Sequence, residues 1–107
     1  MKIPNTPKPP YFAVIFTSEL NEDAPDYKGL SNRMVELVQK QPGFLGFESA
    51  REELGITVSY WKDEASILNW STNLEHQEAQ RLGKEKFYKS YAIRICKVER
   101  AYSFHNQ

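Results

Sequence analysis

Four runs of β-branched and aromatic residues predict four β-strands. They are residues 11–20, 44–52, 56–61 and 87–104. The segment EELG between the second and third runs is typical of a hairpin turn, so these two strands are expected to pair antiparallel. Within the third run the side chains alternate, and opposite faces of the sheet are predicted for two sets: Ile56, Val58 and Tyr60 against Thr57, Ser59 and Trp61.

Apolar residues at helical spacing predict two helices between these runs. Apolar residues at positions 27, 30, 34, 37 and 38 predict a helix that buries one stripe, preceded by capping acids and a proline in NEDAPD and ended by the turn QPGF. Asp63 suits the N-cap of a second helix, whose inward stripe is expected to hold Ile67, Trp70 and Leu74. This second helix is expected to break near the segment STN and to resume through LEHQEAQRLG.

The resulting order βαββαβ predicts the ferredoxin-like α+β fold, an antiparallel sheet with both helices on one face. The first and last strands carry apolar side chains on both sides, so a bare second face would expose on the order of several hundred Å² of apolar surface. A second copy of the chain is the simplest partner to cover this face, because a two-fold interface needs only one self-complementary patch. We therefore expect a homodimer with face-to-face sheets and a cavity between sheet and helices.

The first ten residues differ from the rest of the chain. They include four prolines, which do not suit a helix or a sheet interior, so residues 1–10 are expected to form an arm over a single domain of residues 11–107. Gly46, inside the second strand, predicts that some other segment approaches closely there.

The composition limits the classes of partner that are expected for this protein. Fourteen Lys and Arg balance fourteen Asp and Glu, so neither nucleic acid nor anionic lipid is an expected partner. The N-terminal stretch lacks the apolar core of a signal peptide, and no run of about 18 apolar residues occurs, which favours a soluble protein. The single Cys96 lies in an apolar run and is expected to be buried; it can form neither an internal disulfide nor a metal cluster, and a cytoplasmic setting suits it.

Several motifs together resemble the antibiotic biosynthesis monooxygenase family of dimeric α/β barrels. The segments QPGFLGFES, ITVSYWKDEASILNW, EHQEA and YKSYAIRICKVERAY agree with that family in order and spacing over roughly residues 10–104. The most specific element is a Tyr-Trp pair that ends a strand, followed by an acid-capped helix and a second Trp nine residues after the first. The resemblance implies the barrel fold. For function it implies cofactor-free oxygenation of phenols or quinols, or heme degradation, since one fold hosts several reactions.

The heme-degrading branch can be compared residue by residue. Its members use an Asn on the first strand, the second Trp and an iron-ligating His. Trp70 matches the Trp, but residues 11–20 contain no Asn, and the ligand position falls near Gln80 rather than at His76. Heme binding or degradation is therefore kept as an alternative, and the leading hypothesis needs no metal or other cofactor.

The leading hypothesis is a monooxygenase that acts on a hydrophobic aromatic or quinol-type small molecule. His76 is the candidate base, because an imidazole pKa of about 6.5 lies near working pH, and Trp70 is the second catalytic candidate. The candidate ligand-binding residues, of which Arg94 could stabilise a phenolate, are Phe16, Tyr60, Trp61 and Arg94.

Simpler interpretations exist for the same residues. His76 could be a partly exposed helix residue bonded to Glu75, to Glu78 or to a group on the partner chain, and Arg94 could pair across strands with Glu48 or Glu52. The whole chain could equally be a dimer that binds a hydrophobic small molecule without catalysis.

Overall fold

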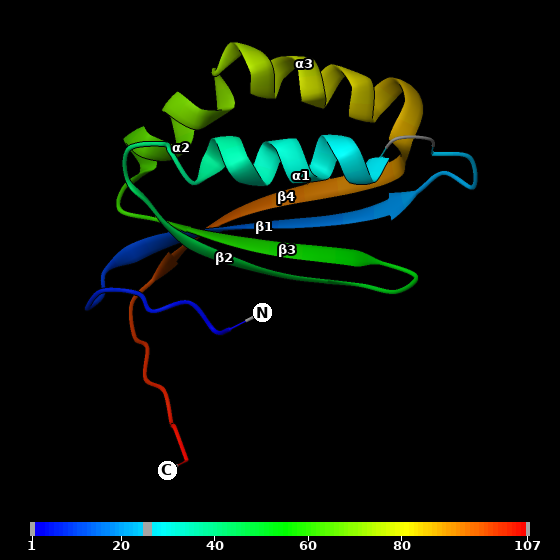
Figure 1. The fold of residues 1–107 in the computed structure, drawn as a ribbon. Helices are drawn as coiled ribbons and strands as arrows, with labels where there is room; N and C mark the ends of the chain where they lie inside the picture. The colour runs from blue at the N-terminus through cyan, green and yellow to red at the C-terminus, as the bar shows by residue number, and fades with distance from the viewer. Residues whose placement is uncertain (1, 25–26, 107) are drawn as a thin grey trace.

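The computed structural model describes residues 2–24 and 27–106, which form one antiparallel sheet with its helices on one side (Figure 1). The strands are β1 (Tyr11–Leu20), β2 (Phe44–Arg51), β3 (Gly55–Trp61) and β4 (Tyr88–Val98). The helices are α1 (Tyr27–Val38), α2 (Glu64–Ser71) and α3 (Leu74–Leu82), and a π-helical turn η1 (Gly83–Phe87) leads into β4. The expected ferredoxin-like α+β fold is confirmed.

The strand order in the sheet is β2-β3-β1-β4, and every neighbouring pair is antiparallel. Phe12 lies opposite Trp61 and Phe16 opposite Thr57, while on the other side of β1 Phe16 lies opposite Ile93. Because side chains alternate along a strand, this register fixes which residues face the helices. The alternation expected within β3 is confirmed by the partners of Thr57 and Trp61.

The last strand is shorter than expected. Val98 lies opposite Tyr11, the first residue of β1, so β4 has no strand partner beyond that point. The expected extension of this strand to residue 104 is therefore wrong. Residues 99–106 leave the sheet, and Tyr102 and Phe104 are exposed (Figure 1).

Two caps define the helical region that follows β3. The Asp63 carboxylate accepts a hydrogen bond of 2.8 Å from the Ser66 amide and begins α2, as expected. The expected break is also confirmed, because α2 ends at Ser71 and Asn73 caps α3. The break changes the helix direction, so Leu74 does not continue the inward stripe and is 83% exposed, contrary to expectation.

The first helix was expected to bury one apolar stripe, and this is wrong for its described residues. None of them is buried, because Leu30, Met34 and Val38 face a cavity rather than packed side chains. The expected start of this helix at Pro25 and Asp26 lies outside the described residues. In residues 2–24 and 27–106 no helix is both long and apolar enough to cross a membrane.

The N-terminal arm covers part of the sheet face away from the helices (Figure 1). A Cβ atom added to Gly46, whose φ is 151°, would lie 2.8 Å from the Cβ of Pro4. Gly46 therefore permits the close approach that the sequence predicted. The hydroxyls of Thr6 and Tyr11 lie 2.8 Å apart and hold the arm where it enters β1.

Cys96 was expected to be buried, and this prediction is wrong. Its thiol is exposed, because β4 has a strand neighbour on one side only and Cys96 lies opposite Ala13 on the face that carries no helix. The apolar run around it indicated a strand correctly, but strand position decides burial.

Two glycine-to-alanine changes should have opposite effects on stability. Gly43 has a φ of 82°, and a Cβ there would lie 2.6 Å from the Ser66 Cβ, so Gly43→Ala should lower the unfolding free energy by about 1–3 kcal/mol. Gly29 lies within α1 with nothing within 4 Å of an added Cβ, so Gly29→Ala should raise it by about 0.5–1 kcal/mol. Urea unfolding followed by circular dichroism measures both; equal effects would contradict this account of Gly43.

Candidate active site between the sheet and the helices

A cavity of about 720 Å³ lies between the sheet and the helices, as the sequence predicted. All four strands and the three α-helices contribute to its wall. The lining is mainly aliphatic and aromatic, and it includes Val14, Phe16, Tyr27, Leu30, Met34, Val38, Phe44, Phe47, Ile67, Trp70, His76, Gln80, Tyr88, Tyr91, Ile93 and Ile95. A largely apolar hollow with few polar groups is the usual form of a small-molecule site.

One wall is a stack of three rings that runs from the sheet to α3. Trp61 is fully buried and packs edge-on against Phe44, with ring centroids 5.3 Å apart. Trp70 stacks on Trp61 at 6.5 Å, and His76 stacks on Trp70 at 4.0 Å with an interplanar angle of 13°. The imidazole is thereby fixed against a flat aromatic surface, while Trp70 and His76 remain in the cavity wall.

The hydrogen bond of His76 determines which ring nitrogen is basic. Its Nδ1 lies 3.0 Å from the Trp70 carbonyl oxygen. A carbonyl oxygen only accepts, so Nδ1 carries the proton and Nε2 keeps its lone pair in the neutral ring. Burial lowers the pKa of His76, and the bond to Trp70 opposes this shift. The ring is therefore neutral near pH 7 and able to accept a proton at Nε2.

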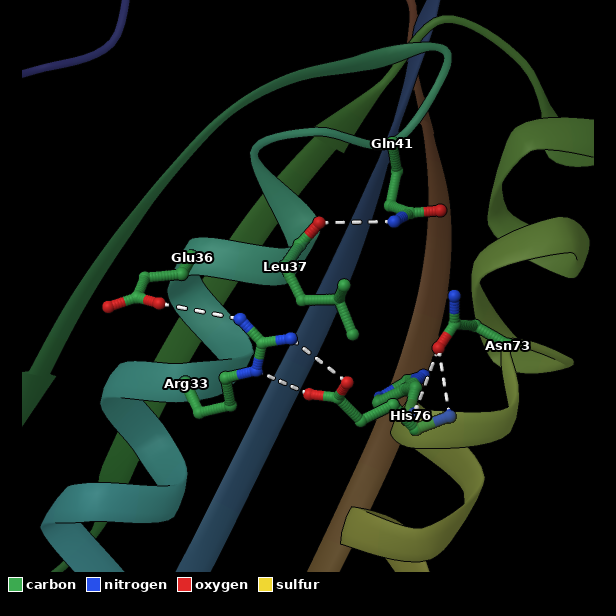
Figure 2. Close-up of polar contacts among 7 residues, drawn as sticks. Arg33, Glu36, Leu37, Gln41, Asn73 and His76 are labelled. Carbon is green, nitrogen blue, oxygen red and sulfur yellow. Dashed lines mark hydrogen bonds and ion pairs between the residues drawn. The ribbon is translucent and has the colours of Figure 1, made fainter.

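The N-terminus of α3 is held from two sides. The Asn73 side-chain oxygen accepts hydrogen bonds from the amides of Glu75 and His76, at 3.0 and 3.1 Å. Arg33 reaches across from α1 and bonds the Glu75 carboxylate at 2.6 Å (Figure 2). These contacts fix the helix turn that carries the imidazole.

The expected carboxylate partners of His76 are engaged elsewhere. Glu75 binds Arg33, which lowers the Glu75 pKa, and Glu78 binds Arg81. The simple interpretation of His76 as a helix residue bonded to Glu75 or Glu78 is therefore wrong. Its described partner is the backbone oxygen of Trp70, because the ring turns inward onto the indole.

A second aromatic group lines the cavity toward the C-terminal end of β1. Tyr88 packs against Phe16 at 5.4 Å, Tyr27 at 5.7 Å and Tyr91 at 5.8 Å. The Tyr88 hydroxyl donates a 3.4 Å hydrogen bond to the Tyr27 hydroxyl. Burial raises the pKa of Tyr88 well above its usual range, so this hydroxyl keeps its proton. Tyr27 and Tyr88 were not among the site residues predicted from the sequence.

The structure brings some predicted site residues together and separates others. Phe16, Trp70 and His76 line the cavity, and Trp61 supports Trp70 from the sheet. Tyr60 and Arg94 lie on the opposite face of the sheet, as their register with Ala13 and Ile15 requires.

Tyr60 has structural partners on that opposite face. Its ring packs edge-on against Tyr11 at 5.9 Å, and its hydroxyl donates to the Glu48 carboxylate at 3.1 Å. Burial, with the Glu48 charge, raises the pKa of Tyr60 to about 12. Arg94 cannot make the expected pair with Glu48 or Glu52, because β1 and β3 separate β4 from β2.

Potential metal-binding side chains are scattered in the part of the chain that the structure describes. There, no cluster of three or more His, Cys, Asp and Glu side chains could hold a metal ion. Gln80, near which the iron-ligand position of the heme-degrading branch is expected to fall, lines the cavity together with Trp70. A glutamine offers only an amide in place of the imidazole that such a site requires.

A comparison with protein-family models identifies one family. The family model described as antibiotic biosynthesis monooxygenase matches residues 12–82. A Bacillus subtilis (strain 168) protein described as "Uncharacterized protein YqjZ" is 50% identical over 97 residues, which cover 89% of this chain and 85% of that protein. A "Jasmonate monooxygenase ABM" of Pyricularia oryzae is 33% identical over 43 residues, 40% of this chain but only 20% of that protein.

Solved structures show the same fold at low sequence identity. SnoaB, described as a cofactor-independent oxygenase from Streptomyces nogalater, matches with a TM-score of 0.74 and 11% identity, over 87% of this chain and 97% of that chain. Rv0793 from Mycobacterium tuberculosis matches with a TM-score of 0.77 and 11% identity, over 87% and 99%. At such identities the likeness shows the fold alone.

Proposed function

Because the chain belongs to the antibiotic biosynthesis monooxygenase family, we propose that it is a cofactor-independent oxygenase for an aromatic or quinol-type small molecule. The observation that carries this proposal is the neutral His76 in the wall of an apolar cavity, with Nδ1 protonated and Nε2 free to accept a proton. Trp70 and Phe16 provide flat surfaces against which an aromatic substrate can stack.

The proposed chemistry begins with proton transfer to His76. For an anthrone-type substrate, removal of a proton from the phenol-activated CH₂ group leaves a delocalised carbanion that O₂ can oxidise. One oxygen atom forms the new C=O bond, and the other leaves as water with the two hydrogens of the CH₂ group. The apolar wall keeps bulk water away from the anion, so it is not simply reprotonated. The protein's contribution is thus a base, a stacking surface and a dry site.

The active form proposed here is a homodimer. Ile93 and Ile95 line the cavity yet are 49% and 53% exposed, so a single chain leaves the cavity partly open along β4. Tyr102 and Phe104 add exposed apolar surface beyond the sheet. A second copy would cover such surface. We also propose a cytoplasmic location, where the exposed Cys96 thiol stays reduced.

Oxygen uptake by the purified protein tests the proposal. The substrates are hydroquinones and anthrone-type phenols, supplied without added metal, flavin or heme. The wild type should consume oxygen with at least one of them. Met34→Trp, which fills the cavity, should lower the rate roughly tenfold or more.

A matched control places the same indole outside the cavity. Asn32 is exposed on α1, so Asn32→Trp should leave the rate near that of the wild type. Tight binding of these phenols without oxygen uptake would reject the oxygenase and favour a binding protein. A Soret band that forms with hemin and decays with a reductant would instead favour the heme alternative.

A further inference from the structure

A positively charged side chain, Arg51, lies near the end of the cavity that Tyr27 and Tyr88 line. Arg51, at the end of β2, donates to the hydroxyl of Ser18 at 2.5 Å and to its carbonyl oxygen at 3.4 Å. Ser18 is only 1% exposed, whereas Arg51 is an exposed residue, so the guanidinium extends from the surface to a buried hydroxyl. A Cβ on Gly55 would collide with the guanidinium, which shows that the guanidinium lies directly over that residue.

Within residues 2–24 and 27–106, the partners of this guanidinium are neutral. Besides Ser18, Arg51 lies 5.5 Å from the centre of the Tyr27 ring and donates a 3.5 Å hydrogen bond to the Tyr27 hydroxyl. Across residues 2–24 and 27–106, the ion pairs do not include Arg51. Arg51 is not among the cavity-lining residues, but it contacts Tyr27, which is, so its positive charge lies beside that end of the cavity and attracts a negatively charged group there.

The two tyrosine hydroxyls connect this charge to the cavity. Tyr27 accepts hydrogen bonds from both Tyr88 and Arg51, so its own proton remains available to a ligand. Both bonds are long, at 3.4 and 3.5 Å, and both tyrosines line the cavity. An oxygen atom of a ligand could therefore receive hydrogen bonds from the two hydroxyls while Arg51 compensates its charge.

This polar group is well separated from the Trp61 stack. Trp61 lies opposite Phe12, whereas Arg51 contacts Ser18, six positions further along β1. Six residues of extended chain span roughly 20 Å along the sheet, so the polar group and the base of the stack lie at different ends of the strands. A ligand could therefore contact the polar group with one part of its structure and the cavity-lining Trp70 and His76 with another.

We propose that Tyr27, Tyr88 and Arg51 form a carboxylate-binding subsite, and that the ligand of this cavity is an aromatic compound with a carboxylate distant from its reacting end. The inference rests on the proposed function in placing its substrate in the same cavity. A purely structural role, in which Arg51 only ties β2 to β1, predicts no preference between an acid and its ester.

Calorimetric titration with 2-naphthoate and methyl 2-naphthoate tests the subsite. The two probes share the ring system and differ in the negative charge. The wild type should bind naphthoate roughly tenfold or more tightly than the ester, as expected for charge-assisted hydrogen bonds. In Tyr27→Phe, Tyr88→Phe and Arg51→Met this ratio should fall severalfold or more, while ester affinity should change by less than about twofold.

Tyr60→Phe is the matched control, because it removes a hydroxyl from the opposite face of the sheet and should leave the ratio unchanged. The two phenylalanine variants of the subsite keep the rings, so they preserve packing if Arg51→Met does not fold. Equal wild-type affinity for acid and ester, no binding of either probe, or a preference that survives all three variants would overturn the subsite. Oxygen uptake is not measured in this titration. A carboxylate preference in a protein that never consumes oxygen would thus uphold the subsite and reject the oxygenase.

Discussion

Replacing His76 by glutamine is expected to lower the turnover number for oxygen uptake by about 10²- to 10⁴-fold, the usual contribution of a positioned base. Glutamine is similar in length, and its NH₂ group can still donate to the Trp70 carbonyl oxygen that now holds Nδ1. It cannot accept a proton at neutral pH. The variant therefore removes proton transfer while leaving the apolar cavity and its stacking surface largely in place.

The pH dependence of the rate identifies the titrating group. The unprotonated imidazole is the active form, so the wild-type rate should be constant at high pH and fall as pH drops through the His76 pKa. Burial lowers that pKa, so the midpoint should lie below about 6.5. The Arg33–Glu75 ion pair next to this ring keeps its charges in that pH range, since it raises the Arg33 pKa and lowers the Glu75 pKa.

Stopped assays between pH 5 and pH 9 measure the effect, and His105→Gln is the control. His105 is exposed in the C-terminal segment, and its replacement should change neither the rate nor the profile. A His76→Gln variant with wild-type turnover, or with the same acidic midpoint, would show that His76 is not the base.

Truncation of Trp61 to alanine is expected to produce the largest loss of stability, about 3–5 kcal/mol of unfolding free energy. Trp61 is fully buried, packs edge-on against Phe44 and stacks against Trp70 on the side of the sheet. Its indole N–H donates to the Ser59 hydroxyl at 2.9 Å, so the change also leaves that hydroxyl without its donor. The resulting void lies beneath the cavity wall, which should lose its rigid support.

Urea unfolding of Trp61→Ala, Trp61→Phe and Trp70→Ala measures this effect. Phenylalanine retains part of the ring, so its cost should be well below that of alanine. Trp70 is only half-buried at the cavity, so Trp70→Ala removes less packing and should also cost less. If Trp70→Ala proved the more costly change, the stack would depend on α2 rather than on the sheet.

Local patterns were sufficient for the elements and for part of the site. Alternation in β3 placed Trp61 and Tyr60 on opposite faces of the sheet, and helical spacing placed Trp70 inward, because each signal depends on a few neighbouring residues. Asp63 and the break before Asn73 were likewise readable, since capping is local chemistry.

Features that depend on the order of the strands in the sheet could not be predicted from local sequence patterns. The expected pairing of Arg94 and burial of Cys96 were wrong because β4 adjoins only β1 in the described sheet. The group of Tyr27, Arg51 and Tyr88 joins α1, β2 and β4, and no short window of sequence contains it. The absence of a side chain at Gly55 was the one local signal, but only the fold shows that a guanidinium occupies that space.

The stacking of Trp70 on Trp61 also has a spectroscopic consequence. The chain contains two tryptophans, and both belong to this single wall. The tryptophan fluorescence of the protein therefore originates from this wall, without a signal from a distant indole. An aromatic ligand that stacks on Trp70, or a proton gained by the adjacent His76 ring, should alter that emission directly. The native chain thus carries its own optical reporter of cavity occupancy, and no label is required.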